Sequence, residues 1–376
     1  MARIIQKRSE VFSAAKAAHR LGAWYHRHRR DLPWRRTRDP YRIWISEVML
    51  QQTQVSTVIA YYERFVRRFP TVRALAKARE ADVLAAWSGL GYYRRARHLH
   101  AAAREIVARH GGRLPSRMDA LRALPGIGSY TAGAIASIAF DRPEPALDGN
   151  AERVLARLLA LRGDPAVAAV RRRLEQAARD LLGCGSPSDI TQALMELGAL
   201  ICTPVSPRCA RCPLARDCEA RARGIEEELP QSGKSRRAER RESAVAIVRH
   251  GGAYLMVRRT GPGLMEGLWE FPGDFLESGE SAAAGLRRVG RQRLGRAIES
   301  EEEIARLSQT ITYRRIRVSA RAAQLSEPAP GWRMPSHARW LTRDRLLRLP
   351  HGSLTARLLA LLEIEPPAAR RRADRS

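Results

Sequence analysis

The feature that most constrains this chain is a group of four cysteines close together in the sequence, Cys202, Cys209, Cys212 and Cys218. The chain has five cysteines and no export signal at its start, so a disulfide framework is not expected. Four thiolates brought together need a cation, because like charges at contact distance repel strongly. The group therefore predicts a metal centre, and we expect Cys184 to be a buried thiol outside it.

The spacing of the four cysteines, C-x6-C-x2-C-x5-C, indicates which metal centre to expect. Structural zinc sites usually present two close pairs of ligands, and here only Cys209 and Cys212 form such a pair. The wider spacing of the other two cysteines favours a 4Fe-4S cluster, with zinc as the alternative. A loop pinned by a cluster would present its interleaved cations, Arg208, Arg211 and Arg216, rigidly to phosphates.

The first part of the chain is predicted to be almost entirely helical. Apolar residues recur at three- and four-residue spacing in 11–27, 43–69, 80–87, 92–109, 131–139, 151–162, 166–182 and 188–201. Short Pro and Gly segments separate these stretches. We therefore expect one helical domain over residues 1–225, with the cysteine loop at 202–218.

The remaining chain follows a different pattern. Residues 226–243 are charged and nearly free of apolar side chains, which indicates a linker. An α+β domain is expected over 244–362, and a disordered tail over 363–376. Its strands are predicted at 244–249, 253–259, 310–320 and 338–341, and its helices at 281–294 and 343–362.

The net charge of the chain indicates which class of partner it binds. Lys and Arg number 67 against 39 Asp and Glu, a net charge of +28. A polyanion relieves the self-repulsion of such a charge, so nucleic acid is the expected partner, although GC-rich coding also produces many arginines. No apolar run approaches the roughly 18 residues of a membrane helix. We expect a cytoplasmic protein without a membrane partner.

A glycine-rich turn, Leu124-Pro125-Gly126-Ile127-Gly128, lies between two predicted helical stretches. Gly126 and Gly128 permit a tight turn whose amides face outward at the start of the next helix. Such amides, together with the helix dipole, bind an anion, and on duplex DNA they hold a phosphate without reading sequence. An ordinary connection between two helices is the alternative.

Two acidic residues are candidates for catalysis. Asp148 lies in Leu147-Asp148-Gly149-Asn150, which also fits a simple turn with Asn150 as a helix cap. Glu47, Gln51 and Gln54 lie at i, i+4 and i+7 of a predicted apolar helix and form one polar stripe, which also fits a solvated face. Burial would raise the pKa of Glu47, as a general acid requires. Two carboxyls in opposed environments are typical of glycosidic cleavage.

These motifs occur together in one known family. The segments ISEVMLQQTQV (45–55), GLGYYRRARHLH (89–100), LPGIGSYTAGAI (124–135) and LDGN (147–150), with the four-cysteine loop, resemble the adenine DNA glycosylases of the MutY family. That family belongs to the endonuclease III superfamily of helix-hairpin-helix proteins. The resemblance runs from about Trp34 to Cys218 and continues more loosely to about residue 360.

The resemblance implies excision of adenine paired with 8-oxoguanine or guanine in double-stranded DNA, as a step of base excision repair. It implies that Glu47 protonates N7 of adenine and that Asp148 stabilises the oxocarbenium sugar, as an ion pair or a transient covalent bond. Asn150 would orient Asp148, and Tyr130 would support the same centre. A monomeric enzyme in a bacterial cytoplasm, associated with the nucleoid, is expected.

The resemblance also implies DNA-binding roles. Gln192 would read the flipped adenine, and Tyr92 and Gln52 would wedge into the base stack. The residues expected to line the DNA path are Trp34, Arg35, Thr53, Leu90 and Gly91.

Position 130 separates two related activities. Bifunctional enzymes of the endonuclease III type carry a Lys there, which forms a Schiff base with the sugar and leads to a strand break. Tyr130 cannot form an imine, so we expect a monofunctional glycosylase. The bifunctional enzyme is the alternative, and a non-enzymatic DNA-binding protein is a third possibility.

The segment from Gly267 to Gly273 resembles the start of a Nudix-like domain, which this family uses to recognise 8-oxoguanine. The acids of the hydrolytic Nudix box fall here on Val289, Gln292 and Arg293, which leaves no cage for Mg²⁺. Binding is therefore the expected role. The Phe-Ser-His loop of the family is replaced by Ile311-Thr312-Tyr313, in which Thr312 keeps the hydroxyl; a hairpin without ligand contact is the alternative.

Overall fold

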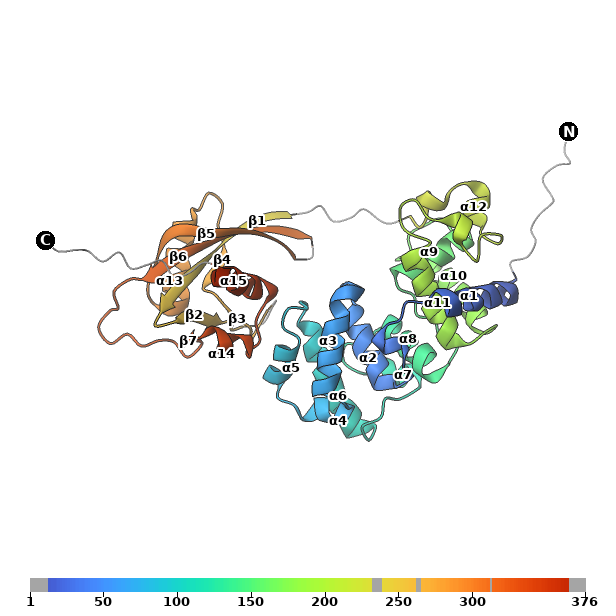
Figure 1. Ribbon diagram of the computed structural model, residues 1–376, viewed down its shortest axis with the longest axis horizontal. Helices are drawn as coiled ribbons and strands as arrows, with labels where there is room; N and C mark the ends of the chain where they lie inside the picture. Colours follow the sequence, from blue (N-terminus) through green and yellow to red (C-terminus); the bar gives the residue numbers. More distant parts are fainter. Residues whose placement is uncertain (1–12, 232–238, 262–264, 312, 365–376) are drawn as a thin grey trace. The chain divides into compact units, whose positions relative to one another are not determined.

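The computed structural model describes residues 13–231, 239–261, 265–311 and 313–364 (Figure 1). Contacts between Cα atoms divide the chain into two compact units. The first unit runs to Lys77 and resumes from His98 to the end of the first described segment. The second unit takes residues 78–97 and the chain from β1 onward. Among the helices of the described residues, none is long and apolar enough to cross a membrane.

The first unit is built of helices. They are α1 (Ala14–His28), η1 (Pro33–Arg35), α2 (Pro40–Leu50), α3 (Val55–Arg68), α4 (Val72–Lys77), α6 (Arg94–Arg109), α7 (Met118–Arg122), α8 (Ser129–Phe140), α9 (Gly149–Leu158), α10 (Ala168–Leu182), α11 (Pro187–Leu200), η2 (Cys209–Arg211), α12 (Glu219–Arg223) and η3 (Glu226–Glu228). Asp39 and Ser186 cap α2 and α11, each followed by a proline at the first helical position.

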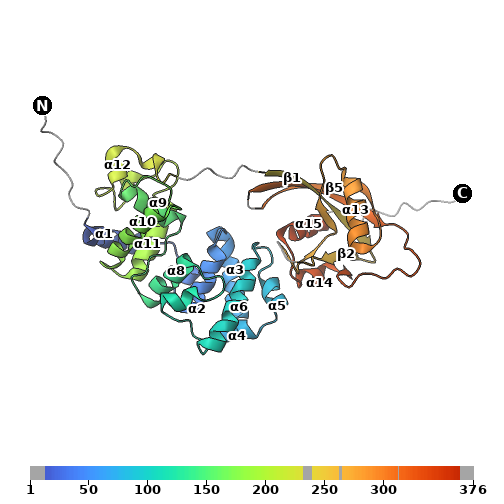
Figure 2. The same ribbon diagram turned by 180° about the vertical axis from the view of Figure 1, so that it is seen from behind.

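Two apolar clusters among the described residues of the first unit hold the helices that surround the site. Apolar faces of α1, α9, α10 and α11 pack together around Leu21, Leu155 and Leu197, and Figure 2 shows these helices as one group. Helix α8 is buried along most of its length and packs against α2 through Ile43, Ala134 and Ile138.

Two glycines allow the segment before α9 to lie close to its neighbours. A Cβ added at Gly133 of α8 would lie 2.1 Å from the carbonyl oxygen of Pro145, and one at Gly198 of α11 would lie 2.6 Å from Cβ of Asn150. Only glycine permits such an approach of backbones. As a result, residues 145–150 are held between α8 and α11.

Two helical predictions need correction in this unit. The stretch 43–69 is two helices, since α2 ends at Leu50 and Gln52 has a positive φ of 55°. Gln51 and Gln54 therefore follow the helix instead of forming a stripe on it. Helix α9 begins at Gly149, and its cap is Asp148 rather than Asn150, because the Asp148 carboxylate accepts the Ala151 amide.

The second unit contains the strands, one helix from residues 78–97 and the start of α6. Its elements are α5 (Glu80–Ala86), β1 (Glu239–His250), β2 (Ala253–Arg258), β3 (Trp269–Glu270), β4 (Gly273–Phe275), α13 (Ala282–Leu294), β5 (Ile298–Ile311), β6 (Arg314–Leu325), β7 (Ala338–Leu341), α14 (Arg343–Leu347) and α15 (Ser353–Ile364).

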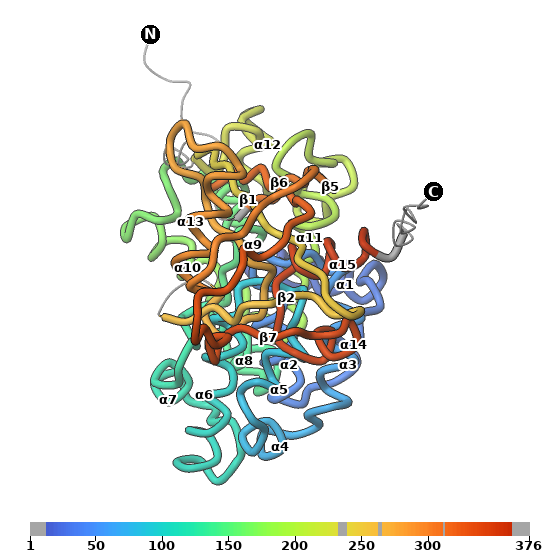
Figure 3. The backbone as a smooth tube through the Cα atoms, turned by 90° about the vertical axis from the view of Figure 1, so that its left-hand side faces the viewer, coloured from blue at the N-terminus to red at the C-terminus, as the bar shows by residue number. Residues whose placement is uncertain are grey.

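The strands form one mixed sheet in the order β3-β2-β1-β6-β5, with β4 paired to β1 and β7 paired to β2. Strands β1 and β6 are parallel and run side by side in Figure 3. Val245 and Ile247 of β1 face a core shared with α14 and α15, whereas Ala244 and Ala246 face α13. The sheet therefore has helices on both faces, which confirms the predicted α+β class.

Four details of the second half differ from the predictions. Strand β5 was not expected, because its charged sequence IESEEEIARLSQTI suits the exposed edge of a sheet. The stretch 343–362 is two helices, separated by residues that include Pro350 and Gly352. The linker prediction is too long, since η3 lies at its start and β1 begins at Glu239. Helix α15 reaches Ile364, and the rest of the predicted tail lies outside the described residues.

Candidate active site

A cavity of about 610 Å³ in the first unit brings most of the predicted site residues together. Its walls come from η1, α2, the segment after α2, the start of α8, the start of α9, and α11. The four predicted catalytic side chains all line it, namely Glu47, Tyr130, Asp148 and Asn150. Glu47 and Asp148 therefore share one cavity.

The carboxyl of Glu47 lies at the edge of the core, with only 5% of the residue exposed. The pKa of Glu47 is raised to about 7, mainly by burial and in part by the nearby Asp148 carboxylate. The hydrogen bond from Tyr130 and the charge of Arg35 act in the opposite direction. Glu47 is thus balanced between its protonated and ionised forms near neutral pH, which suits a general acid.

Tyr130 is the direct partner of Glu47. Its hydroxyl donates a hydrogen bond of 2.6 Å to Oε2 of Glu47, from the first turn of α8. Burial raises the pKa of Tyr130 well above its usual range, as do the charges of Glu47 and Asp148. The hydroxyl therefore remains a proton donor to the Glu47 carboxylate at neutral pH.

Asp148 has a more polar environment than Glu47. One carboxylate oxygen accepts the Ala151 amide at 2.7 Å, and the other accepts Nδ2 of Asn150 at 2.9 Å. The pKa of Asp148 is raised on balance, because the effect of burial exceeds that of these donors, which lower it. Because the donors face the oxygens, they stabilise the ionised form and fix its orientation at the start of α9.

Asn150 is held in turn by Arg153. The Arg153 guanidinium donates to Oδ1 of Asn150 at 2.9 Å, to the carbonyl of Gly198 at 2.9 Å and to the carbonyl of Cys202 at 2.7 Å. A hydrogen-bonded path therefore runs from Asp148 to the first cysteine of the loop.

Several predicted DNA-binding residues line the same cavity. These are Trp34, Arg35, Gln52, Thr53 and Gln192, and Gln51 and Gln54 line it as well. The amide nitrogen of Gln192 donates to the Ser188 carbonyl at 3.2 Å within α11. The indole of Trp34 packs edge-on against Tyr62, with ring centres 5.4 Å apart.

Two charged residues of this cavity, Arg30 and Glu196, were not predicted from the sequence. The Glu196 carboxylate is bound by both Arg30 and Arg35. A signal was present, because Glu196 is a lone acid in the apolar run Ala193-Leu194-Met195-Glu196-Leu197 of a helix. A charge in such a run requires a buried partner.

Leu90, Gly91 and Tyr92 belong to the second unit. Leu90 is buried, whereas Tyr92 is 38% exposed, with the Arg95 guanidinium 5.5 Å from the centre of its ring. Both Gly91 and Tyr92 have a positive φ, so the backbone makes a tight turn there. In this same unit the backbone nitrogen of His351 donates to the Ser88 hydroxyl at 3.1 Å.

The glycine turn lies between α7 and α8. Gly126 has a φ of 74°, and a Cβ there would lie 2.5 Å from Cβ of His98. Gly128 is the exposed residue before α8, and a Cβ there would meet nothing within 4 Å. Ile127 is buried between them, so the turn is anchored while its glycines face outward.

The four clustered cysteines line one small cavity of about 20 Å³, together with Arg157. Nη1 of Arg157 lies 3.4 Å from Sγ of Cys202, and the Arg157 carbonyl lies 3.4 Å from Sγ of Cys218. The pKa of Cys212 is raised to about 12, mainly by burial and in part by the charges of the other three cysteines. A cationic centre in this cavity would stabilise the thiolate form, which burial disfavours at Cys209, Cys212 and Cys218.

Within the described residues, no three His, Cys, Asp or Glu side chains converge as ligands of a single metal ion. The four cysteines line one cavity and would supply thiolates, which are the ligands that an iron–sulfur cluster takes. The prediction for Cys184 is wrong, since this residue is exposed.

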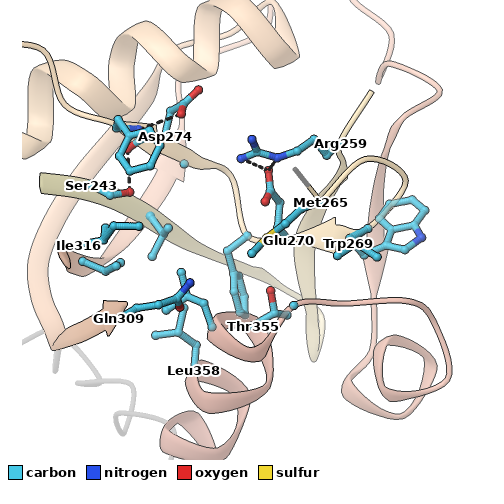
Figure 4. Close-up of a pocket in the computed structure, with 18 residues that line it drawn as sticks. Ser243, Arg259, Met265, Trp269, Glu270, Asp274, Gln309, Ile316, Thr355 and Leu358 are labelled. Carbon is cyan, nitrogen blue, oxygen red and sulfur yellow. Dashed lines mark hydrogen bonds and ion pairs between the residues drawn. The ribbon is translucent and has the colours of Figure 1, made fainter. Parts of the chain in front are cut away.

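The second unit contains a further cavity, of about 100 Å³, shown in Figure 4. Glu270 on its wall accepts hydrogen bonds from Arg259 and from Arg293, each at 2.9 Å. Arg293 also reaches Asp274 at 3.2 Å. Arg293 stands at a position where the hydrolytic Nudix box has an acidic residue. Here it forms ion pairs with two carboxylates instead. Thr312 lies outside the described residues.

Comparisons with known proteins match both units. Residues 45–180 match the HhH-GPD superfamily of base excision DNA repair proteins, and residues 244–361 match the NUDIX domain. The chain is similar to a solved structure of a thermostable thymine-DNA glycosylase, with 29% identity and a TM-score of 0.51 over 56% of this chain and 97% of that one. The predicted helix-hairpin-helix domain with a Nudix-like domain is confirmed.

Curated relatives extend along nearly the whole chain. An adenine DNA glycosylase of Homo sapiens is 35% identical in an alignment of 380 positions that spans 86% of this chain and 70% of the relative. One of Mus musculus is 34% identical in an alignment of 432 positions that spans 98% of this chain and 82% of the relative. The chain therefore belongs to the adenine DNA glycosylase family of base excision repair enzymes.

Proposed function

We propose that this chain is a monofunctional glycosylase that excises adenine paired with 8-oxoguanine or guanine in double-stranded DNA, acting as a monomer. The observation that carries the proposal is the shared cavity of Glu47 and Asp148. One of these carboxyls is buried with a pKa near neutrality, and the other is held by hydrogen-bond donors. Such a pair divides the roles of acid and charge stabiliser.

In this mechanism Glu47 donates its proton to N7 of adenine. The bond between C1′ of the sugar and N9 then breaks, and its electron pair leaves with the protonated base. The positive charge that develops on the sugar is stabilised by the Asp148 carboxylate, which Asn150 orients. Water adds to C1′, and its proton passes to the Glu47 carboxylate, which restores the acid.

Adenine reaches these groups only after it leaves the base stack. The cavity volume of about 610 Å³ is sufficient for an extruded nucleoside. We expect Gln192 to hydrogen-bond the base edge, and Gln52 and Tyr92 to fill the gap in the stack. Gly126 and Gly128 would hold a phosphate beside the start of α8.

The absence of an amine at position 130 supports the monofunctional assignment. The hydroxyl of Tyr130 is hydrogen-bonded to Glu47 and cannot form an imine with the sugar. The lyase alternative needs a different amine, and among the described residues that line the cavity there is no lysine.

The 4Fe-4S cluster would be held by Cys202, Cys209, Cys212 and Cys218, and its contribution is structural. The exposed arginines of this loop, Arg208, Arg211 and Arg216, would contact phosphates. In the second unit, Thr312 and Tyr313 would contact 8-oxoguanine. Arg293 is paired with Glu270 and Asp274, so this unit would bind DNA rather than hydrolyse nucleotides.

A duplex assay tests the proposal. The wild-type protein is expected to release adenine opposite 8-oxoguanine and guanine, with strand breaks only after alkali. Glu47→Gln and Asp148→Asn should each abolish release, whereas the matched substitutions Glu105→Gln and Asp180→Asn on other helices should not. Breaks without alkali would support the lyase, and no release from any duplex would support a DNA-binding protein without enzymatic activity.

A further inference from the structure

The cavity contains a buried ion-pair network that the proposed mechanism does not use. Glu196 of α11 has a side chain only 1% exposed. Its Oε1 accepts hydrogen bonds from the backbone nitrogen and Nε of Arg30, at 2.8 and 3.0 Å. The same oxygen accepts one from Nη1 of Arg35, at 2.8 Å. Its Oε2 accepts Nη2 of each arginine, at 2.7 and 2.8 Å. Every lone pair of the carboxylate is therefore engaged.

The network carries a net positive charge. Although burial alone would raise it, hydrogen bonds from Arg35 and Arg30 lower the pKa of Glu196 to about 2, so the carboxylate is ionised. Two guanidinium groups share this one carboxylate, and Arg35 is only 9% exposed. Burying three charges costs free energy. An apolar side chain at this position of α11 would fill the same space without that cost, so packing alone does not explain Glu196.

The network faces the catalytic carboxyls. Arg30, Arg35 and Glu196 all line the cavity that Glu47 and Asp148 share. The charged and titratable groups that act on Glu47 are Tyr130 from α8, Asp148 before α9, and Arg35 from η1. Arg35 is thus the cation of the network that acts on Glu47, and Glu196 is the anion that fixes its position.

From this geometry we propose that Glu196 is a positioning residue of the glycosylase site. It holds Arg35 in the cavity wall, and it cancels part of the positive charge that Arg30 and Arg35 would otherwise impose on Glu47. The proposal rests on the proposed role of Glu47 as the acid that protonates adenine.

The network predicts that two single substitutions shift the alkaline fall of the excision rate in opposite directions along the pH axis. Glu196→Gln leaves both guanidinium groups uncompensated, which favours ionised Glu47 and moves the alkaline fall of the excision rate to lower pH. Arg35→Gln removes the cation that acts on Glu47 and leaves Glu196 with one partner, which moves the fall to higher pH. Each shift should be about one pH unit, because each substitution changes the charge near Glu47 by one unit in a partly buried site.

The double variant Glu196→Gln/Arg35→Gln restores the net charge of the network to one, as in the wild type. The midpoint, which is the pH at which the excision rate has fallen by half on the alkaline side, should therefore return close to the wild-type value. Each single substitution moves this midpoint. Loss of packing would instead lower the rate or the stability without this reversal.

The experiment measures single-turnover adenine release against pH, at saturating protein, for the wild type, both single variants and the double variant. Thermal melting checks that each variant folds. Glu105→Gln on α6, where Glu105 pairs with Arg109, is the control and should leave the midpoint unchanged. If Glu196→Gln does not fold, the shift of Arg35→Gln to higher pH still tests the sign that the network predicts.

Opposite shifts that cancel in the double variant are the expected result. Midpoints that coincide, or that move in the same direction, would overturn the proposal for Glu196. These outcomes differ from failure of the proposed function, in which the wild type itself releases no adenine. NMR titration of the ¹³C-labelled Glu47 carboxyl should show the same order of midpoints without any substrate.

Discussion

Removing the Tyr130 hydroxyl offers a direct test of how Glu47 is controlled. In Tyr130→Phe, the 2.6 Å hydrogen bond to Oε2 of Glu47 is lost while the ring remains. That bond lowers the pKa of Glu47 against the effect of burial. A hydrogen bond to a charged group contributes about 1.5–3 kcal/mol, which corresponds to roughly one to two pKa units.

The sign of the expected shift follows from which form is stabilised. The hydroxyl stabilises ionised Glu47, so its loss raises the pKa above the wild-type value of about 7. The excision rate falls as Glu47 loses its proton, and this fall should therefore occur at higher pH in the variant. Single-turnover adenine release, read as alkali-labile breaks between about pH 5 and pH 9.5, gives the midpoint.

A matched substitution separates this effect from the loss of any buried hydroxyl. Tyr41 lies on the same helix as Glu47 and donates to the Phe69 carbonyl at 2.6 Å. Tyr41→Phe should lower stability without moving the midpoint. A midpoint in Tyr130→Phe that is unchanged or lower would refute the view that this hydroxyl stabilises the Glu47 carboxylate.

Three further predictions concern stability and the cysteine loop. The pKa of Glu47 rises from 4.5 to about 7 on folding, so this residue destabilises the protein as pH increases through that window. Glu47→Gln should therefore gain roughly 2–4 kcal/mol over the wild type at pH 8 and little below pH 4.5, and an advantage in denaturant titrations that does not grow with pH would contradict this. Gly133→Ala should lower both the melting temperature and the excision rate, because its Cβ would lie 2.1 Å from the Pro145 oxygen, whereas Gly22→Ala, with its nearest contact at 3.9 Å, should be tolerated. Cys202→Ser should lose visible absorbance and iron, and Cys184→Ser should keep both; stoichiometric zinc in a colourless wild-type protein would show that the centre is not an iron–sulfur cluster.

Local patterns allowed much of the fold to be predicted. The helical spacing, the glycine turn and the cysteine group are each contained within short segments, so they could be read without knowing the tertiary structure. The break at Gln51–Gln54 was missed, because those residues have ordinary helical propensity and the positive φ of Gln52 depends on tertiary context. Strand β5 was missed because an edge strand tolerates charge on its exposed face.

The site was predicted less completely than the fold. Glu47, Asp148, Asn150 and Tyr130 were found because they belong to recognisable motifs, and they do line one cavity. The Glu196 network was not found, since Arg30 and Arg35 are more than 160 residues away from it in sequence. Long-range ion pairs leave no periodic pattern, so only the isolated charge in an apolar helix indicated a partner.

The central claim is that Glu47 and Asp148 act on the same N-glycosidic bond. A crystal structure of the protein on a duplex with an uncleavable adenosine analogue opposite 8-oxoguanine tests it most directly. We expect the adenine inside the cavity of the first unit, with Glu47 in hydrogen-bond reach of N7 and Asp148 beside C1′. An adenine bound elsewhere, or one that contacts only one of the two carboxyls, would contradict the account.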